Sequence, residues 1–377
     1  MAMVMLMSSG LFSPTAFVLT DASASDKAVG LLDSALGAGE SSVTHAYKVI
    51  FHLQEGFCDV IFNRPTTFLL DDVLNQKILT IFSAGFFPYL TFFPLSAPEM
   101  VATGEDSFST SMAFRFRFKV GVFKRLKFDR LSDVKIKNWR IPLMQGYAFD
   151  LLASSGMVAL SGPSGSGKTS FALYLLQAVY SAGAELMIID PKLDNSLYRF
   201  AEKRKVSYVT PGDNSNDYFN AILKILSLQV DEIHKRQKMS LEGKNDFELR
   251  PRVLFIDEAM ALTASITDSK QVKQYLSLIS QITLQGRSAK VFLWLGAQTF
   301  SASGSDIVMS SSSRDQMALK VVLSQVETDW RYLFKDLNLQ SMVLTRDGFS
   351  KGLGVAGMMS DGRVVPFLAP KIDDLEG

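Results

Sequence analysis

The sequence predicts an α/β protein in which a parallel sheet carries helices on both faces and is preceded by a smaller β-rich accessory domain. From Tyr147 onward, short apolar runs such as "GMVALSG", "AELMIIDP" and "RVLFIDE" alternate with longer segments of helical periodicity. Strands that are buried on both faces form continuous apolar runs, so this alternation indicates a covered parallel sheet. Before it, "YKVIFHL", "CDVIF" and "MAFRFRFKVGVF" are rich in the β-branched and aromatic residues that favour strands.

Length and composition are those of a globular protein of about two domains. The 377 residues are 47% apolar and 20% charged, and the formal net charge is only +1, so net charge indicates no particular partner. A single cysteine, Cys58, excludes an internal disulfide framework and a cysteine-rich zinc site. We expect it to be a packed core residue of a cytoplasmic protein.

Composition divides the chain into three expected regions. Residues 1–43 are rich in Ser, Ala, Gly and Met and are expected to form a poorly ordered arm, residues 44–146 the β-rich domain, and residues 147–377 the larger domain. The uncharged N-terminal stretch lacks the basic segment of a secretory signal. The apolar stretch from Ile78 to Pro98 is long enough to span a bilayer, but glycine and prolines interrupt it. We therefore expect buried strands and turns there, and no membrane contact.

The stretch "SGPSGSGKTS" follows an apolar run and precedes a helical one. It matches the spacing G-x-x-x-x-G-K-[ST] of a phosphate-binding loop in the strand-to-helix context that this loop requires, and a plain Gly/Ser turn is the alternative. In such a loop the backbone N–H groups and the helix start bind phosphate, which predicts a P-loop NTPase fold of the RecA-like type. We expect Lys168 to bridge the β- and γ-phosphates of ATP, and Thr169 to bind Mg²⁺. The expected nucleotide-binding residues are Gly162, Pro163, Ser164, Gly165, Ser166, Gly167, Lys168, Thr169 and Ser170.

Two acidic residues follow the apolar run "RVLFI". At the end of a buried strand, Asp257 is expected to hold Mg²⁺ through its water shell and Glu258 to polarise the attacking water. An acidic helix cap is the alternative for this pair. Together with the phosphate-binding loop, the pair predicts ATP hydrolysis.

Three further polar residues are candidates for the catalytic site. Gln298 ends the apolar run "VFLWLGAQ", where it would lie near the γ-phosphate and sense the nucleotide or orient water; a solvated loop glutamine is the alternative. Arg287 is a candidate arginine finger that reaches the nucleotide of a neighbouring subunit, since a guanidinium stabilises the charge of the transition state. Arg314 is the second candidate, and a surface arginine is the alternative for both.

Residues from about Leu143 to Ile372 resemble the motor domain of FtsK/SpoIIIE DNA translocases within the wider FtsK/HerA group. The resemblance rests on "IIDPK", on "VDEIHKRQKM" with its Glu-x-x-x-Arg spacing, and on "GRSAKVFLWLGAQ" with a Gly-Arg, a strand and a terminal Gln. It implies a hexameric homo-oligomeric ring around double-stranded DNA, with hydrolysis shared between adjacent subunits. It also implies ATP and Mg²⁺ as cofactors.

The chain departs from the chromosome-segregating members of that family. Membrane helices and a C-terminal winged-helix reader are not evident, and Gly-Ala stands before Gln298 where many relatives have Ala-Thr. We therefore expect a compact motor of a plasmid, an integrative element or a virus, cytoplasmic or virion-associated, with a transfer-machinery or phage-capsid partner; peripheral membrane association stays open. The alternatives are a viral genome-packaging ATPase, a type IV coupling or type VII secretion ATPase acting on protein, and a nucleotide-gated scaffold.

Three other segments are candidate surfaces for contact with DNA or with solvent. Alternation in "FRFRFKV" predicts one buried phenylalanine face and one row of cations, which either follows DNA phosphates or is an ordinary solvated face. The small hydroxyl residues of Ser301–Ser313 suit sequence-blind phosphate contact, with a plain loop as the alternative. The charged helix around Glu232 and Arg236 is expected to present a solvated face. The three histidines lack metal-ligand spacing.

Overall fold

The structure, a computed structural model, describes residues 3–5, 18–36, 47–62, 72–94, 99–102, 112–211, 215–243, 249–264, 268–300, 307–324, 327–335, 351–359 and 363–376. These residues form two compact units, the first ending at Val122 and the second beginning at Phe123. The division lies earlier than the expected domain boundary at Gly146, because residues after Phe123 pack on the larger unit. The ring of Phe128, for example, lies 5.7 Å from that of Tyr174 in the second unit. No described helix combines the length and apolar character needed to cross a membrane.

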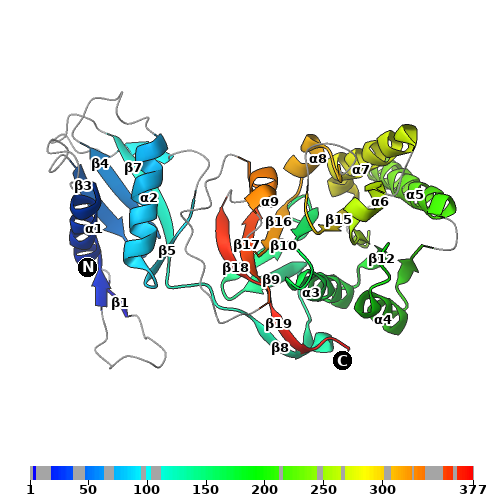
Figure 1. The fold of residues 1–377 in the computed structure, drawn as a ribbon, viewed down its shortest axis with the longest axis horizontal. Coiled ribbons are helices and arrows are strands. Elements are labelled where there is room, and N and C mark those ends of the chain that lie inside the picture. Colours follow the sequence, from blue (N-terminus) through cyan, green and yellow to red (C-terminus); the bar gives the residue numbers. More distant parts are fainter. Residues whose placement is uncertain are drawn as a thin grey trace. The chain divides into compact units, whose positions relative to one another are not determined.

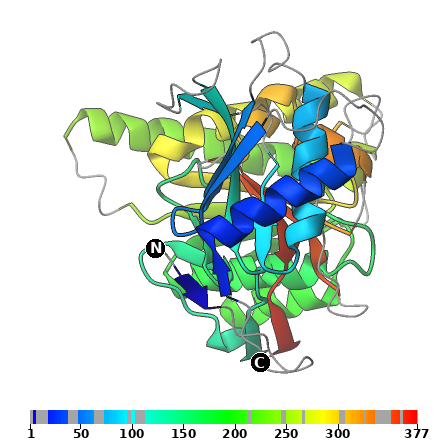
Figure 2. The ribbon, with the colours of Figure 1, turned by 90° about the vertical axis from the view of Figure 1, so that its left-hand side faces the viewer.

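The first unit is a small antiparallel sheet with two helices (Figure 1). Its strand order is β3-β4-β7-β5, and β6 also pairs with β7. Helices α1 and α2 pack against each other, and Figure 2, which faces this unit, shows them crossing. The elements are β1 (Met3–Met5), β2 (Val18–Thr20), α1 (Asp21–Leu36), β3 (Tyr47–His52), β4 (Phe57–Phe62), α2 (Asp72–Phe86), β5 (Leu90–Phe92), β6 (Glu99–Ala102) and β7 (Met112–Val120).

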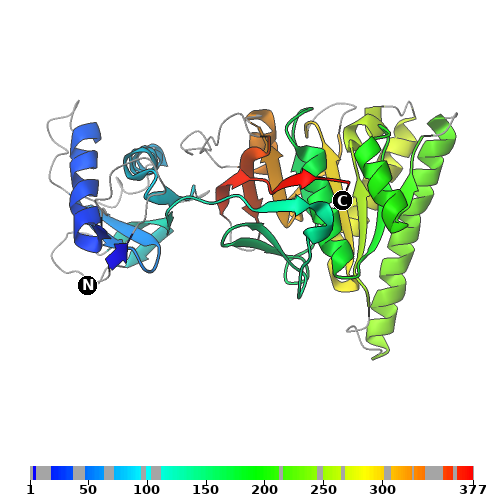
Figure 3. The same ribbon diagram turned by 90° about the horizontal axis from the view of Figure 1, so that it is seen from below.

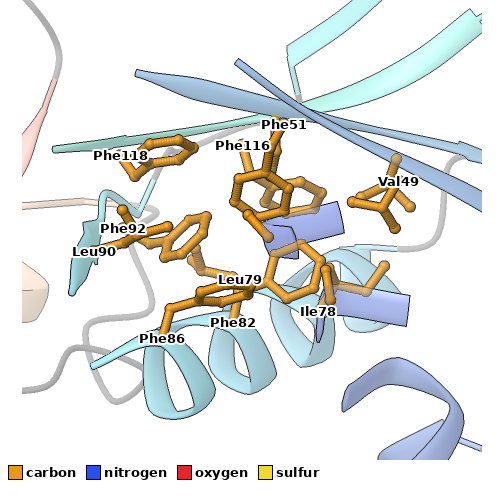
Figure 4. Close-up of a cluster of buried hydrophobic side chains, with 14 of the residues drawn as sticks. Val49, Phe51, Ile78, Leu79, Phe82, Phe86, Leu90, Phe92, Phe116 and Phe118 are labelled. Atoms are coloured by element: carbon orange, nitrogen blue, oxygen red, sulfur yellow. The ribbon is translucent and has the colours of Figure 1, made fainter. Parts of the chain in front are cut away.

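An aromatic core joins both helices to one face of this sheet (Figure 4). Phe82 is fully buried, and its ring lies 5.5 Å from that of Phe92 and 5.8 Å from that of Phe116. Cys58 is buried, as expected. Aromatic rings packed at these distances contribute both buried area and favourable ring contacts, so the core accounts for the cohesion of the unit.

Two expectations for this unit differ from the structure. The segment expected to be a poorly ordered arm contains α1, whose Ala24, Ala28 and Leu32 are buried in the aromatic core. The stretch from Ile78 to Pro98, expected to form strands and turns, continues helix α2 as far as Phe86 and only then forms β5. The prolines lie beyond the end of the helix, so they do not interrupt it.

Strand β7 alternates as predicted, but its two arginines are paired with acids. Phe114, Phe116 and Phe118 are buried. On the other face the Arg115 guanidinium donates to both carboxylate oxygens of Asp59 at 2.8 Å. Arg117 donates to both oxygens of Glu99 at 2.7 and 2.5 Å. The acids on the neighbouring strands neutralise this part of the expected cation row, so the structure favours a solvated face over a surface for DNA phosphates.

The second unit contains a sheet that, within the described residues, has eight strands in the order β13-β12-β14-β15-β11-β16-β17-β18. The strands from β13 to β16 are parallel, and β17 and β18 continue the sheet in antiparallel fashion. This is the expected mixed α/β fold with a mostly parallel sheet, beside a smaller antiparallel one. The strands are β11 (Val158–Ser161), β12 (Glu185–Ile189), β13 (Ser207–Val209), β14 (Arg252–Ile256), β15 (Val291–Ala297), β16 (Leu319–Leu323), β17 (Leu353–Met358) and β18 (Val364–Leu368).

Helices cover both faces of this sheet. From β11 to β13 the chain moves along the sheet in one direction, and from β13 to β15 it moves in the other. Right-handed crossovers therefore place α3 and α4 on one face and α5 and α7 on the opposite face, as Figures 1 and 3 show. The helices are α3 (Lys168–Ser181), α4 (Asn195–Arg204), α5 (Ser215–Leu241), α6 (Ala259–Ala264), α7 (Ser269–Ala289), α8 (Ser311–Asp315) and α9 (Glu327–Leu333).

The segment that precedes β11 forms short strands and packs against α3. The α3 residue Tyr174 donates its hydroxyl to the carbonyl oxygen of Pro142, and Gln177 donates to that of Val134 at 3.4 Å. These contacts tie the segment before β11 to the helix that follows the phosphate-binding loop. The elements are β8 (Lys127–Arg130), which pairs with β19 (Lys371–Asp374), the 3₁₀ turn Leu131–Asp133, and β9 (Arg140–Met144), which pairs with β10 (Tyr147–Asp150).

Candidate functional site

The predicted phosphate-binding loop connects β11 to α3. Gly165 and Gly167 have φ angles of +82° and +97°, in the left-handed region that favours glycine. Gly167 caps the N-terminus of α3, which begins at Lys168. The loop therefore turns tightly and presents backbone N–H groups and the positive end of a long helix at the carboxyl edge of the parallel strands.

A cavity of about 240 Å³ lies at this edge. It brings together the residues predicted from three separate motifs: the phosphate-binding loop, the acidic pair after β14 and Gln298 after β15. All three lie there because parallel strands direct their carboxyl ends to one edge of the sheet. The lining residues are Pro163, Ser164, Gly165, Gly167, Lys168, Thr169, Ser170, Lys192, Asp194, Asp257, Glu258, Gln298 and Lys351.

The Lys168 ammonium is buried and contacts both acids. Its Nζ lies 3.1 Å from Oδ1 of Asp257 and 2.5 Å from Oε1 of Glu258. Burial raises the pKa of Asp257, and the charge of Lys168 acts against that rise. Glu258 has a φ of +46°, which is uncommon for a residue with a side chain and is stabilised here by its surroundings. The arrangement brings an ammonium and two carboxyl groups together where they are shielded from water, which strengthens each interaction.

The residues of the loop fit a phosphate group. The Ser166 hydroxyl is buried without a protein partner. A Cβ on Gly162 would lie 2.4 Å from that hydroxyl, and one on Gly167 would lie 3.1 Å from the backbone nitrogen of Gly352, so a side chain at either position would force its neighbour to shift. The donor set also fits Mg²⁺, because Thr169 and Asp257 line the same cavity with the hard oxygen atoms that this ion prefers.

Two lysines of the cavity were missed as site residues. Lys192, which follows β12 in "IIDPK", has its Nζ 3.3 Å from Oε1 of Glu258. Lys351 precedes β17, and its carbonyl oxygen accepts a 2.7 Å hydrogen bond from Arg125. The next residue, Gly352, donates its N–H to the carbonyl oxygen of Ser166 at 2.7 Å. Lys192 lies in "IIDPK" at the end of an apolar run, whereas no sequence pattern near Lys351 indicates proximity to the loop.

The two candidate arginine fingers lie apart from the chain's own cavity. Arg287 is exposed near the C-terminus of α7 and donates to the carbonyl oxygen of Ala153 at 3.4 Å, at the edge where the parallel strands begin. Arg314 is largely buried, pairs with Asp315 at 2.8 Å and lies over the ring of Tyr332. Arg287 is therefore exposed at the far edge of the sheet, whereas Arg314 is engaged within its own chain.

The structure also bears on the serine-rich segment and on the charged helix. In Ser301–Ser313, residues 301–306 lie outside the described part, and the Ser310 and Ser313 hydroxyls bond to Ser280 at 3.0 and 3.1 Å. Arg236, expected on a solvated helix face, is buried and donates to Glu232 at 2.7 Å and to the carbonyl oxygen of Ala289 at 3.0 Å. The Glu-x-x-x-Arg spacing thus joins α5 to the end of α7.

Fold and site together define a P-loop nucleotide-binding protein. Within that class the chain is a homologue of an FtsK domain-containing protein, YdcQ of Bacillus subtilis (strain 168), with 27% identity over 254 residues. This confirms the expected resemblance to FtsK-type domains. The match covers 65% of this chain and 49% of YdcQ, so the chain spans about half the length of this relative. No protein-family model matches the chain.

Three solved structures illustrate the range of similar chains. The pCW3 conjugation coupling protein TcpA, a monomer with ATPgS, is 16% identical with a TM-score of 0.49, covering 93% of this chain and 95% of that one. EssC (ATPases 2 and 3) of Geobacillus thermodenitrificans is 15% identical with a TM-score of 0.46, covering 67% and 48%. The genome packaging NTPase B204 of Sulfolobus turreted icosahedral virus 2, with AMP, is 14% identical with a TM-score of 0.36, covering 57% and 98%.

Proposed function

We propose that the chain is an ATP-hydrolysing motor that moves double-stranded DNA as a ring of identical subunits, for a plasmid, an integrative element or a virus. One observation carries the ATPase part: Lys168, Asp257, Glu258 and Gln298 converge on one cavity beside the phosphate-binding loop. Support for DNA as the substrate comes from the resemblance of residues 143–372 to FtsK/SpoIIIE DNA translocases, and the homologue YdcQ is itself an FtsK domain-containing protein.

Each residue has a separate task in the proposed reaction. The loop N–H groups and Lys168 bind the phosphates of ATP, so Lys168 exchanges its two carboxylate partners for phosphate oxygens. That exchange removes one of the two ammonium groups that contact Glu258, the other being Lys192, so that Glu258 can accept the proton of the attacking water while Gln298 orients the water. Thr169 and Asp257 would hold Mg²⁺, which neutralises charge on the phosphates.

Arg287 is the proposed trans residue. A guanidinium near the γ-phosphate stabilises the charge that spreads over the phosphoryl oxygens in the transition state. Because Arg287 lies at the opposite edge of the sheet from its own cavity, it would act on the nucleotide of a neighbouring subunit. The proposed ring supplies that neighbour, and the cavity of Lys168 would then lie at a subunit contact.

The test is the ATPase rate with and without duplex DNA across a series of salt concentrations. We expect stimulation that declines as salt rises, because DNA binding releases counterions. Glu258→Gln should still bind ATP while its kcat falls about 10²–10⁴-fold, the usual contribution of a general base. A Glu258→Gln variant with the normal rate would refute the base assignment. ATPase activity indifferent to DNA would favour a protein-secretion ATPase, and ATP binding without turnover a nucleotide-gated scaffold.

A further inference from the structure

Asp329 is a fully buried carboxylate on α9 that the proposed reaction does not use. Its Oδ1 accepts hydrogen bonds from the Thr299 hydroxyl at 2.7 Å and from the backbone N–H of Phe300 at 2.8 Å. Its Oδ2 accepts one from the hydroxyl of Ser161. A buried carboxylate is stable only when donors surround it, and three donors do so here.

These donors belong to residues that flank two parts of the nucleotide site. Ser161 is the last residue of β11 and directly precedes Gly162 of the phosphate-binding loop. Thr299 and Phe300 directly follow Gln298, and the Ser161 hydroxyl also lies 3.4 Å from the carbonyl oxygen of Gln298. One carboxylate therefore connects the strand that enters the loop to the strand end that carries the predicted water-orienting residue.

Helix α9 makes two further contacts through Tyr332. The Tyr332 ring is stacked on that of Phe300, with centroids 6.5 Å apart and an interplanar angle of 6°. The Tyr332 hydroxyl donates to the carbonyl oxygen of Met309 at 3.0 Å. Because Tyr332 and Asp329 both hold this short helix against the segment after β15, the Asp329 carboxylate has a defined position, which a supporting residue of a reaction site requires.

We propose that Asp329 is a positioning residue for ATP hydrolysis, which holds Gln298 in register with the phosphate-binding loop through Ser161 and Thr299. This role rests on the proposed ATPase function and assigns it a residue outside the cavity. The rate of an enzymatic reaction depends strongly on how its groups are positioned. A small displacement of Gln298 would therefore lower the rate of hydrolysis even though the side chain is still present. Asp329 affects the chemical step more than the binding of ATP, because Lys168 and the loop N–H groups remain in place.

The first test is Asp329→Asn in the full chain. The amide oxygen retains the bonds from Thr299 and Phe300, whereas the amide N–H₂ now donates to Ser161, so the fold is kept and the bond to a charged acceptor is lost. We expect kcat about tenfold lower, with the KM for ATP changed by less than about twofold. The matched control is Asp373→Asn, which removes an exposed carboxylate that pairs with Lys371.

Substitutions on the donor side give an independent test if Asp329→Asn does not fold. Thr299→Val removes the hydroxyl and should lower kcat, whereas Thr299→Ser retains it and should restore most of the rate. Combining Ser161→Ala with Thr299→Val should lower kcat by less than the product of the single effects, as for groups that act through one carboxylate. Variants that melt at lower temperature but keep the wild-type kcat would overturn the positioning role.

The wild-type assay separates the two levels of inference. A wild-type chain without ATP turnover would overturn the proposed function itself. A wild type that hydrolyses ATP while folded Asp329→Asn, Ser161→Ala and Thr299→Val match its kcat would overturn only the role of Asp329.

Discussion

The two compact units both place charged residues beside apolar strands, but they use those charges differently. In the first unit, Arg115 and Arg117 on β7 meet acids on the adjacent strands, so the charges are satisfied across the sheet surface. In the second unit, Lys168 is buried at a strand end with two carboxylates that both line a cavity. Cations that are paired across a strand face stabilise the structure slightly, whereas charges gathered at strand ends in a cavity are available for chemistry.

Removing an aromatic residue from the core of the first unit should give the largest loss of stability. Phe82→Ala deletes a fully buried ring that lies close to other phenylalanine rings, and we expect about 3–5 kcal/mol less free energy of unfolding. Chemical denaturation measures the loss. The ATP affinity of the folded protein should stay unchanged. A comparable loss of ATP-binding free energy would show that the aromatic core of the first unit also supports the nucleotide site.

Removing the buried lysine of the second unit should chiefly affect catalysis. Lys168→Ala deletes the cation that binds phosphate and leaves Asp257 and Glu258 without it, so we expect kcat to fall at least about 10²–10³-fold. Steady-state ATPase kinetics measure this loss. Lys371→Ala is the control, because it removes an exposed lysine paired with Asp373. Comparable rates for the two variants would contradict the assignment of Lys168.

Two glycine substitutions test how closely the phosphate-binding loop packs against Gly352. Gly167→Ala forces a side chain at φ +97° and places its Cβ 3.1 Å from the backbone nitrogen of Gly352. Left-handed backbone alone costs about 1–2 kcal/mol, and we expect at least that loss of ATP-binding free energy by calorimetry. Gly165→Ala has a φ of +82° but no atom within 4 Å of the new Cβ, so its effect should be smaller. Equal effects would mean that the contact with Gly352 contributes nothing.

The smallest effect should come from the paired cations of β7. Arg117→Gln loses a partly exposed ion pair with Glu99, and we expect at most about 1 kcal/mol of free energy of unfolding to be lost. The salt dependence of DNA binding should not change. A variant that lost one phosphate contact would instead show a slope of log affinity against log salt that is smaller by about 0.9. That result would indicate that β7 contacts DNA phosphates.

Much of the nucleotide site was predictable because its signals are local. Gly162 to Thr169 lie within one short stretch, and the acidic pair and Gln298 each follow a continuous apolar run, so the carboxyl edge of a parallel sheet was expected to unite them. Lys351 was not predictable, because its carbonyl bond to Arg125 and the neighbouring Gly352 bond to Ser166 join distant parts of the chain. Helix α2 was not predictable from the sequence, because the prolines that follow it closely are typical of strand ends and turns.

The type of fold and most of the groups that face the cavity follow from local sequence, because spacing and hydrophobic periodicity are properties of neighbouring residues. Packing sets which charges are neutralised and which act together. Arg115 meets Asp59, and Asp329 meets Ser161 and Thr299, across long stretches of chain. The electrostatic interactions of a charge depend on its distance to other charges and its exposure to water, and packing sets both.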